Sequence, residues 1–255
     1  MGRQPRGIQS LEVGGRLLAA LVAGPADMSL KELSTAAGMA PAQAHGYLAS
    51  YRRTGLVEQD AATGHYRLGP FATRLAMARL RTQPALAAAV AATTRVADTA
   101  GIMATLAVWG PHGPTVIHRT DGEEVLNVNI RVGTMFALAA TSPAIVFAAF
   151  GDPERTVEVR GAGGVRERLA LGDLLTRDTA IGEAATAVRA AGHAILRNTP
   201  VPGVNALAAP LIDAEGDLTA AIIVMGSPAR LDVAAPDGVL ETLTATTSGL
   251  ATAAA

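Results

Sequence analysis

Two helix signals separated by a glycine, close to the N-terminus, constrain the fold more than any other part of the chain. Ser29 and Glu32 make a capping-box pattern at the start of an apolar helical segment, and Gly38 ends that segment. Pro41 suits the first turn of the next helix, because its missing N–H would have no partner there. Small or apolar residues recur at the positions where two such helices cross: Leu33, Ala37, Met39, Ala44 and Tyr47. This spacing is typical of a helix-turn-helix, whose second helix enters the major groove of DNA.

The flanking residues complete a winged unit. The apolar spacing predicts a first helix over residues 11–23 with Ser10 as its N-cap, and a third helix from Pro41 to about Thr54. Two short strands, residues 56–59 and 65–68, follow around a turn at 60–64. The alternation along the second strand predicts that Tyr66 and Leu68 face inward and that His65 and Arg67 face outward.

Charge is divided unevenly along the chain. Residues 1–81 hold 10 Lys and Arg against 5 Asp and Glu, a net +5, and the rest holds 11 against 17, a net −6; the two give the overall −1. A basic N-terminal part on a larger acidic body suits a small nucleic-acid contact attached to a module with another task.

The remaining sequence predicts an α+β sensor-like domain. Helices are expected over 84–101, 141–150, within 162–191 and over 236–255, and strands over 102–109, 115–119, 125–132, 193–197, 205–212 and 218–225. The predicted division is a winged helix-turn-helix DNA-binding domain at 1–70, a helical linker at 71–83 and an effector-binding domain at 84–255.

Several classes of chemistry lack their residues. The chain has no cysteine, which excludes disulfides and thiolate metal sites, and its one lysine, Lys31, belongs to no phosphate-binding loop. His112 and His118 have no further metal-type ligands patterned near them, and Thr141-Ser142 has no nucleophile elbow around it. We therefore expect no catalysis, no metal and no cofactor. With no signal peptide in the sequence and polar interruptions in its longest uncharged stretch, we expect a cytoplasmic protein.

Motifs along nearly the whole chain resemble the isocitrate lyase regulator (IclR) family. The matching stretches are 8–12, 30–33, 55–60, 64–70, 131–133, 140–141, 203–211, 213–217 and 226–231. The resemblance implies a winged-helix repressor or activator that forms a homodimer or homotetramer, binds double-stranded operator DNA, and carries a GAF-like effector domain for a small organic acid or aromatic metabolite. Residues 44–48 and 109–114 resemble a subgroup associated with catabolic genes, often for aromatic acids.

The predicted recognition helix departs from the family pattern. Pro41-Ala42-Gln43 replaces a polar run, and Gly46 replaces an arginine. Base reading requires hydrogen-bonding side chains, so weak binding, shape-dominated readout and reliance on the wing remain open, as does a ligand-binding module with little specific DNA binding. The candidate DNA contacts are Arg3, Arg6, Gln43, His45, Ser50, Arg52, Arg53, His65 and Arg67.

The predicted effector site also departs from the family. Residues 139–143 stand where the family has a loop that lines the site, and Ile223 and Met225 stand where serines are common, so the pocket should favour a flatter, more apolar ligand. Ile223 and Met225 could equally be core residues. Arg119 and Arg131 are possible carboxylate partners. The remaining candidate contacts are Thr141, Ser142, Arg197, Asn198, Asn205 and Ala206.

Overall fold

The computed structural model describes residues 7–82, 84–110, 112–139, 141, 143–160 and 166–253. The chain divides into two compact units, Met1–Thr82 and Gln83–Ala255, called here the N-terminal and C-terminal units. No helix among the described residues is long and apolar enough to cross a membrane.

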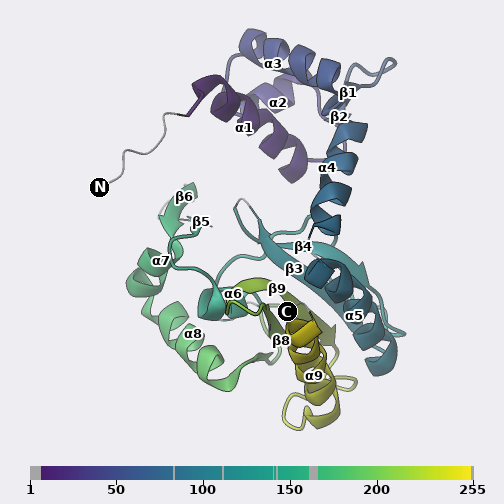
Figure 1. Cartoon of the computed structure of the whole chain (residues 1–255), viewed down its shortest axis with the longest axis vertical. Coiled ribbons are helices and arrows are strands. Elements are labelled where there is room, and N and C mark those ends of the chain that lie inside the picture. The colour runs from purple at the N-terminus through teal and green to yellow at the C-terminus, as the bar shows by residue number, and fades with distance from the viewer. Residues whose placement is uncertain are drawn as a thin grey trace. The chain divides into compact units, whose positions relative to one another are not determined.

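The N-terminal unit holds three helices, a two-stranded wing and a fourth helix (Figure 1). Its elements are α1 (Gln9–Ala23), α2 (Leu30–Ala36), α3 (Pro41–Thr54), β1 (Val57–Gln59), β2 (Tyr66–Leu68) and α4 (Pro70–Arg81). Leu17, Leu33 and Leu48, one from each of the first three helices, are fully buried and form the centre of its core.

Local chemistry sets most of the helix ends in this unit. The Ser29 backbone N–H donates to Glu32 Oε2 at 2.8 Å and the Ser29 hydroxyl accepts from the Glu32 N–H at 3.3 Å, so the predicted capping box is confirmed. Gly38 and Gly55 end α2 and α3 with φ of 61° and 76°. The predicted Ser10 cap is wrong: α1 begins at Gln9 after Ile8, with no side-chain cap.

The wing is an antiparallel pair in which Val57 lies opposite Leu68 and Gln59 opposite Tyr66. Tyr66 is buried, as predicted, and its backbone N–H and C=O both pair with Met28. Leu68 is 39% exposed, so the prediction that it faces the core is wrong. Leu68 is the last residue of β2 and lies outside the buried cluster to which Tyr66 belongs.

The C-terminal unit is built on a five-stranded antiparallel sheet with the strand order β4-β3-β9-β8-β7. These strands are β3 (Met103–Gly110), β4 (Gly113–Thr120), β7 (Ala194–Leu196), β8 (Asn205–Ile212) and β9 (Leu218–Gly226). A separate hairpin joins β5 (Thr156–Arg160) to β6 (Arg166–Ala170).

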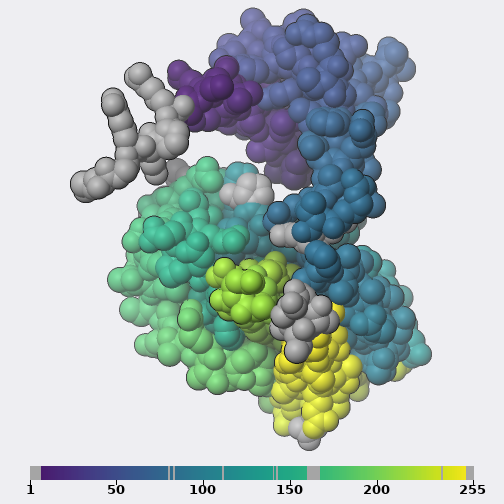
Figure 2. Space-filling model, in the orientation of Figure 1, coloured from purple at the N-terminus to yellow at the C-terminus, as the bar shows by residue number. Residues whose placement is uncertain are grey.

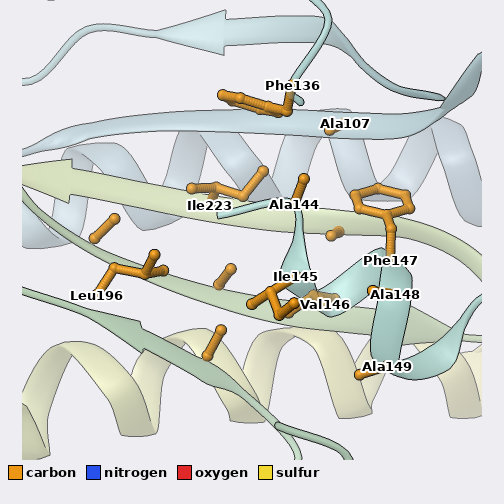
Figure 3. Close-up of a cluster of buried hydrophobic side chains, with 14 of the residues drawn as sticks. Ala107, Phe136, Ala144, Ile145, Val146, Phe147, Ala148, Ala149, Leu196 and Ile223 are labelled. Atoms are coloured by element: carbon orange, nitrogen blue, oxygen red, sulfur yellow. The ribbon is translucent and has the colours of Figure 1, made fainter. Parts of the chain in front are cut away.

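Helices cover both faces of the sheet. Ile223 and Met225 belong to the buried cluster that includes α6 (Ile145–Phe150) and α8 (Thr179–Ala191), with α7 (Leu171–Arg177) beside them (Figure 3). Because side chains alternate along a strand, the buried Ile222 and Val224 point to the opposite face. There α5 (Pro84–Ala100) and α9 (Asp237–Ala253) pack side by side, teal-blue against yellow in Figure 2.

Three predicted elements of this unit need correction. Residues 125–132 form no strand, because residues 133–136 take the edge of β4 instead: the Val116 N–H donates to the Thr134 C=O at 2.9 Å. Residues 166–170 pair with β5 and are a strand rather than part of a helix. Helix α6 begins at Ile145 rather than at 141, two residues after Pro143, which has no backbone N–H to donate and would break a hydrogen bond inside a helix.

Candidate functional sites

Helix α3 presents a surface that its own packing leaves free. Ala44 and Leu48 are fully buried and fix the inward side of the helix, whereas Ala42, Gln43, His45 and other residues of the first turns are exposed. A Cβ placed on Gly46 would meet nothing within 4 Å, so the middle of this face is open. The face is continuous with the end of α3 that carries Arg52 and Arg53.

Most of the predicted DNA-contacting side chains on α3 already have partners within the unit. Arg52 donates to Gln59 Oε1 at 2.9 Å, and Arg53 donates to the Ser50 hydroxyl at 3.2 Å. The Ser50 hydroxyl donates to the backbone C=O of Gly46 at 3.2 Å. No hydrogen bond joins the side chain of Gln43 or His45 to another residue in the part of the chain that the structure describes.

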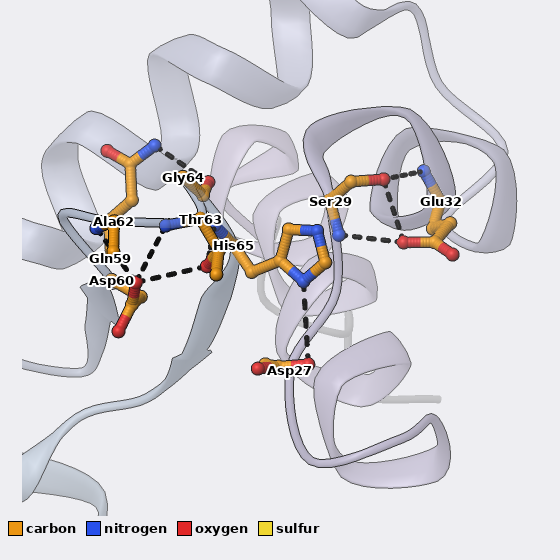
Figure 4. Close-up of polar contacts among 9 residues, drawn as sticks. All are labelled: Asp27, Ser29, Glu32, Gln59, Asp60, Ala62, Thr63, Gly64 and His65. Atoms are coloured by element: carbon orange, nitrogen blue, oxygen red, sulfur yellow. Dashed lines mark hydrogen bonds and ion pairs between the residues drawn. The ribbon is translucent and has the colours of Figure 1, made fainter.

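The wing residues are also paired. Arg67 Nε lies 2.5 Å from Glu58 Oε1, and this hydrogen bond raises the pKa of the guanidinium above its usual value. His65 Nδ1 lies 3.5 Å from Asp27 Oδ1 (Figure 4). Both pairs are solvent-exposed and therefore weak enough to exchange for a phosphate.

Asp60 fixes the turn between the two wing strands. Its carboxylate accepts from the backbone N–H of Thr63 at 2.8 Å and of Ala62 at 2.9 Å (Figure 4), and these bonds hold the pKa of Asp60 below its usual value. The wing is thus a defined hairpin on which the Arg67 side chain is exposed. Arg3 and Arg6, the other predicted contacts, lie outside the described residues.

The C-terminal unit contains a cavity of about 250 Å³ beside the sheet. Its walls come from three places: the segment that follows residue 127, the loop between β7 and β8, and the adjoining ends of β8 and β9. The lining residues are Val128, Ile130, Thr134, Met135, Phe136, Ala137, Ala139, Thr141, Pro143, Thr199, Pro200, Val201, Val204, Ala206 and Met225.

Three of the predicted effector contacts meet at this cavity. Thr141, Ala206 and Met225 line it, and Ala206 lies directly opposite Met225 in the β8–β9 pairing. Ile223 is fully buried in the core instead (Figure 3). Ser142 lies outside the described residues.

The predicted arginines and asparagines lie elsewhere. Arg119 donates to Asp121 and to the backbone C=O of Ile130, while Arg131 and Arg197 are exposed and do not line the cavity. Asn198 and Asn205 bind each other: the Asn198 N–H donates to Asn205 Oδ1 at 2.9 Å. Asn205 is 3% exposed, and its Nδ2 donates to the Leu231 C=O at 2.8 Å, so both asparagines hold the β7–β8 loop that forms one wall of the cavity.

The polar groups at the cavity are hydroxyls and backbone amides. Every charged side chain of the described chain lies outside the lining set, whose polar members are Thr134, Thr141 and Thr199. Among the described residues, no hydrogen bond uses the backbone N–H of Ala137, Ala139 or Thr141. An apolar pocket with a few polar groups is the usual form of a small-molecule site.

The sequence-based reasoning missed most of the cavity wall. Val128 and Ile130 alternate with polar residues, a pattern that predicted a strand; here the same alternation turns one side of an extended segment toward the cavity. Phe136, Pro200 and Val201 carried no local signal, because only the folded sheet brings their loops together.

The described residues contain no group of three or more His, Asp or Glu arranged to hold a metal ion. His118 Nε2 lies 3.2 Å from the hydroxyls of Thr94 and Thr120, and His112 Nδ1 lies 3.6 Å from Glu158 Oε1. Both histidines thus lie beside polar groups of their own fold.

Comparison with known proteins agrees with this arrangement. Residues 10–61 match the IclR helix-turn-helix domain, and residues 77–252 match the bacterial transcriptional regulator IclR C-terminal domain. The chain is 33% identical over 233 residues to the glycerol operon regulatory protein of Streptomyces griseus, covering 91% of this chain and 89% of that protein.

Two solved structures resemble the whole chain. The crystal structure of Pseudomonas aeruginosa HmgR has a TM-score of 0.55 at 30% identity and covers 96% of this chain and 98% of that one. An IclR homologue from Microbacterium hydrocarbonoxydans, complexed with 4-hydroxybenzoate, has a TM-score of 0.70 at 20% identity and covers 95% and 98%.

The fold and these matches define a transcriptional regulator with a winged helix-turn-helix domain and an α+β C-terminal effector domain, which confirms the predicted fold class. The chain belongs to the IclR family of bacterial transcriptional regulators. Its helix-turn-helix domain implies DNA binding, and the C-terminal domain of this family binds a small-molecule effector.

Proposed function

We propose that this protein controls a catabolic operon by binding operator DNA through α3 and the wing, and that a small organic acid bound in the 250 Å³ cavity changes that binding. The observation that carries the proposal is the cavity itself, apolar on most sides and bordered by backbone amides without partners among the described residues. The relatives support the class of target, since the Streptomyces griseus protein is a glycerol operon regulator.

The size of the cavity favours a ligand with one ring. An apolar cavity of about 150 Å³ admits benzene, so 250 Å³ accommodates one ring with small substituents. The complex of the Microbacterium homologue holds a ligand of this size and class, 4-hydroxybenzoate. An aromatic acid would place its ring against Phe136 and Met225, with its carboxylate at the amides of Ala137, Ala139 and Thr141 rather than at Arg119 or Arg131.

Two copies of the chain would suit a two-fold operator. A homodimer, alone or paired into a homotetramer, places two recognition helices on half-sites about one helical turn apart. The effector then acts by binding one arrangement of the DNA-binding domains more tightly than another, which is a coupling free energy between the two sites. Regulation of an operon in this way belongs to the bacterial cytoplasm. In this proposal residues 1–70 bind DNA, residues 71–83 form the linker and residues 84–255 bind the effector.

A second candidate is a ligand-binding protein with little specific DNA binding. Two observations favour it: Arg52 and Arg67 are engaged with Gln59 and Glu58, and Gly46 leaves the middle of α3 without a side chain.

The first test measures binding of the full-length protein to the promoter region beside its own gene. Fluorescence anisotropy reports the affinity at each concentration of a salt series. Selective binding that weakens steeply with salt, compared with a random duplex of equal length, supports the regulator. Equal and feeble binding to both duplexes supports the second candidate.

The second test is calorimetric titration with 4-hydroxybenzoate and related acids. Ala206→Leu should fill the cavity and abolish binding, whereas Met225→Leu, which conserves volume at the opposite position, should preserve it. Equal affinity of the two variants would place the effector elsewhere.

A further inference from the structure

We propose that α3 reads an A·T-rich sequence, with Gln43 binding an adenine and Ala42 contacting a thymine methyl group. This inference rests on the proposed DNA-binding function and names the bases that the helix recognises. It follows from which side chains of α3 face outward, which of them are free of internal partners, and what each can bind.

The geometry of the helix selects the outward residues. An α-helix turns by about 100° per residue, so the direction opposite the buried Ala44 and Leu48 passes through Ala42, Gly46 and Arg53. Gln43 and Ser50 flank that line within the outward half of the helix. His45 and Arg52 lie outside this half. Of the polar residues here, only Gln43 lies both in the first turn of α3 and in its outward half.

The first turn of a recognition helix is the part that contacts base edges. In α3 this turn is Pro41, Ala42 and Gln43, with no arginine or lysine before Arg52. A bidentate contact to guanine requires arginine or lysine, whereas a glutamine amide pairs with N6 and N7 of adenine. The helix therefore lacks the side chain that reads guanine and carries the one that reads adenine.

The internal contacts point the same way. Arg52 is held by Gln59, and Arg53 by Ser50, at the end of the helix where phosphate contacts are expected. The Gln43 amide has no partner among the described residues, so it can bind a base without first breaking a bond within the protein. At Gly46 the absent side chain lets the helix backbone approach the floor of the groove, which brings the methyl group of Ala42 within reach of a thymine methyl.

The test is selection from a pool of random duplexes by the full-length protein, followed by sequencing of the bound DNA. Wild type should select a motif dominated by A·T pairs. Gln43→Ala should lower the discrimination at one adenine by between about 5-fold and 150-fold. Gln9→Ala, which removes another exposed glutamine, on α1, should leave the motif unchanged. Gly46→Arg should add a guanine to the motif, since the new side chain has open space around it.

A second arm tests the methyl contact. Replacing thymine by uracil in the selected site removes one methyl group and no hydrogen bond, and should weaken binding about fourfold at a single position. Ala42→Gly should abolish that difference.

The outcomes separate this inference from the function on which it rests. A guanine-dominated wild-type motif, or a motif that survives Gln43→Ala unchanged, would overturn the inference and leave the regulator intact. If wild type selects no motif and binds all duplexes equally, the proposed operator binding fails and the inference fails with it. Because Gln43 is exposed, its replacement tests recognition rather than folding.

Discussion

Two adjacent glycines of α1 should respond in opposite ways to the same substitution. A Cβ on Gly14 would lie 2.3 Å from the Tyr51 hydroxyl oxygen and 2.9 Å from Tyr47 Cδ1, both on α3, whereas a Cβ on Gly15 would meet nothing within 4 Å. Gly14 is buried and Gly15 is partly exposed. Both replacements by alanine remove the backbone entropy cost of a helical glycine. The difference between their effects on stability therefore measures the energy of packing α1 against α3 at Gly14.

The magnitudes follow from these two terms. Alanine should stabilise a helix interior by about 0.5–1 kcal/mol relative to glycine. At Gly15 nothing opposes that gain, so opening of α1 should become about 2- to 5-fold rarer. At Gly14 the tyrosines must move, and overpacking costs about 1–3 kcal/mol. With mid-range values of both terms, the net effect of Gly14→Ala is a destabilisation of roughly 1.25 kcal/mol, or about 8-fold more frequent opening of α1 and α3.

Hydrogen exchange followed by mass spectrometry on the full chain would measure both effects. Peptides from α1 and α3 should exchange faster in Gly14→Ala and slower in Gly15→Ala, while peptides from the sheet of the C-terminal unit stay unchanged. Equal protection in the two variants would refute the close approach of α1 to the tyrosines of α3.

Three further predictions concern charge and hydrogen bonding. Glu58→Gln should release Arg67 for a phosphate and tighten operator binding severalfold at low salt; unchanged affinity in the anisotropy assay would place Arg67 off the DNA. Hydrogen bonding to Ser29 lowers the pKa of Glu32, so the stability that this carboxylate contributes is present above about pH 4.3 and is lost as the pH falls through the lower folded-state pKa. Thermal unfolding of the N-terminal unit should show that loss, and Glu32→Gln should show less of it. Asn205→Leu should destabilise the C-terminal unit by about 1–3 kcal/mol and weaken effector binding, because it leaves the Asn198 N–H and the Leu231 C=O without their partner. Asn205→Asp can still accept from the Asn198 N–H, so it should lose less stability and less affinity. Calorimetry compares the two variants.

Local chemistry explains which elements could be predicted from the sequence. The α2 cap depends on Ser29 and Glu32, three residues apart, and Gly38 and Gly55 end their helices through their own backbone conformations. Such signals are complete within one turn of chain. The helix-turn-helix and the wing could therefore be predicted closely, and the errors there are a cap at one end and the exposure of Leu68.

Strand pairing in the C-terminal unit depends on partners far along the chain. Residues 125–132 have the alternation of a strand, but β4 has one free edge and residues 133–136 occupy it. Residues 166–170 become a strand because β5 lies opposite them. A short window of sequence does not show which segment will pair with a distant strand edge. Alternation therefore predicts which side of a segment is apolar, but not its hydrogen-bond partner.

The asparagines show the same limit at the candidate site. From the sequence, Asn198 and Asn205 are polar groups near an expected pocket, and a ligand contact is the natural interpretation. In the fold, Asn205 accepts from the Asn198 N–H and donates to the Leu231 C=O, while Asn198 Oδ1 accepts from the Gly203 N–H. A buried amide whose groups are bound to backbone holds a loop in place. The donors that have no partner among the described residues are instead the backbone amides of Ala137, Ala139 and Thr141, and the side chains at these positions gave no sign of this. We therefore expect a substitution that disturbs this loop, such as Asn205→Leu, to change ligand affinity without touching the ligand.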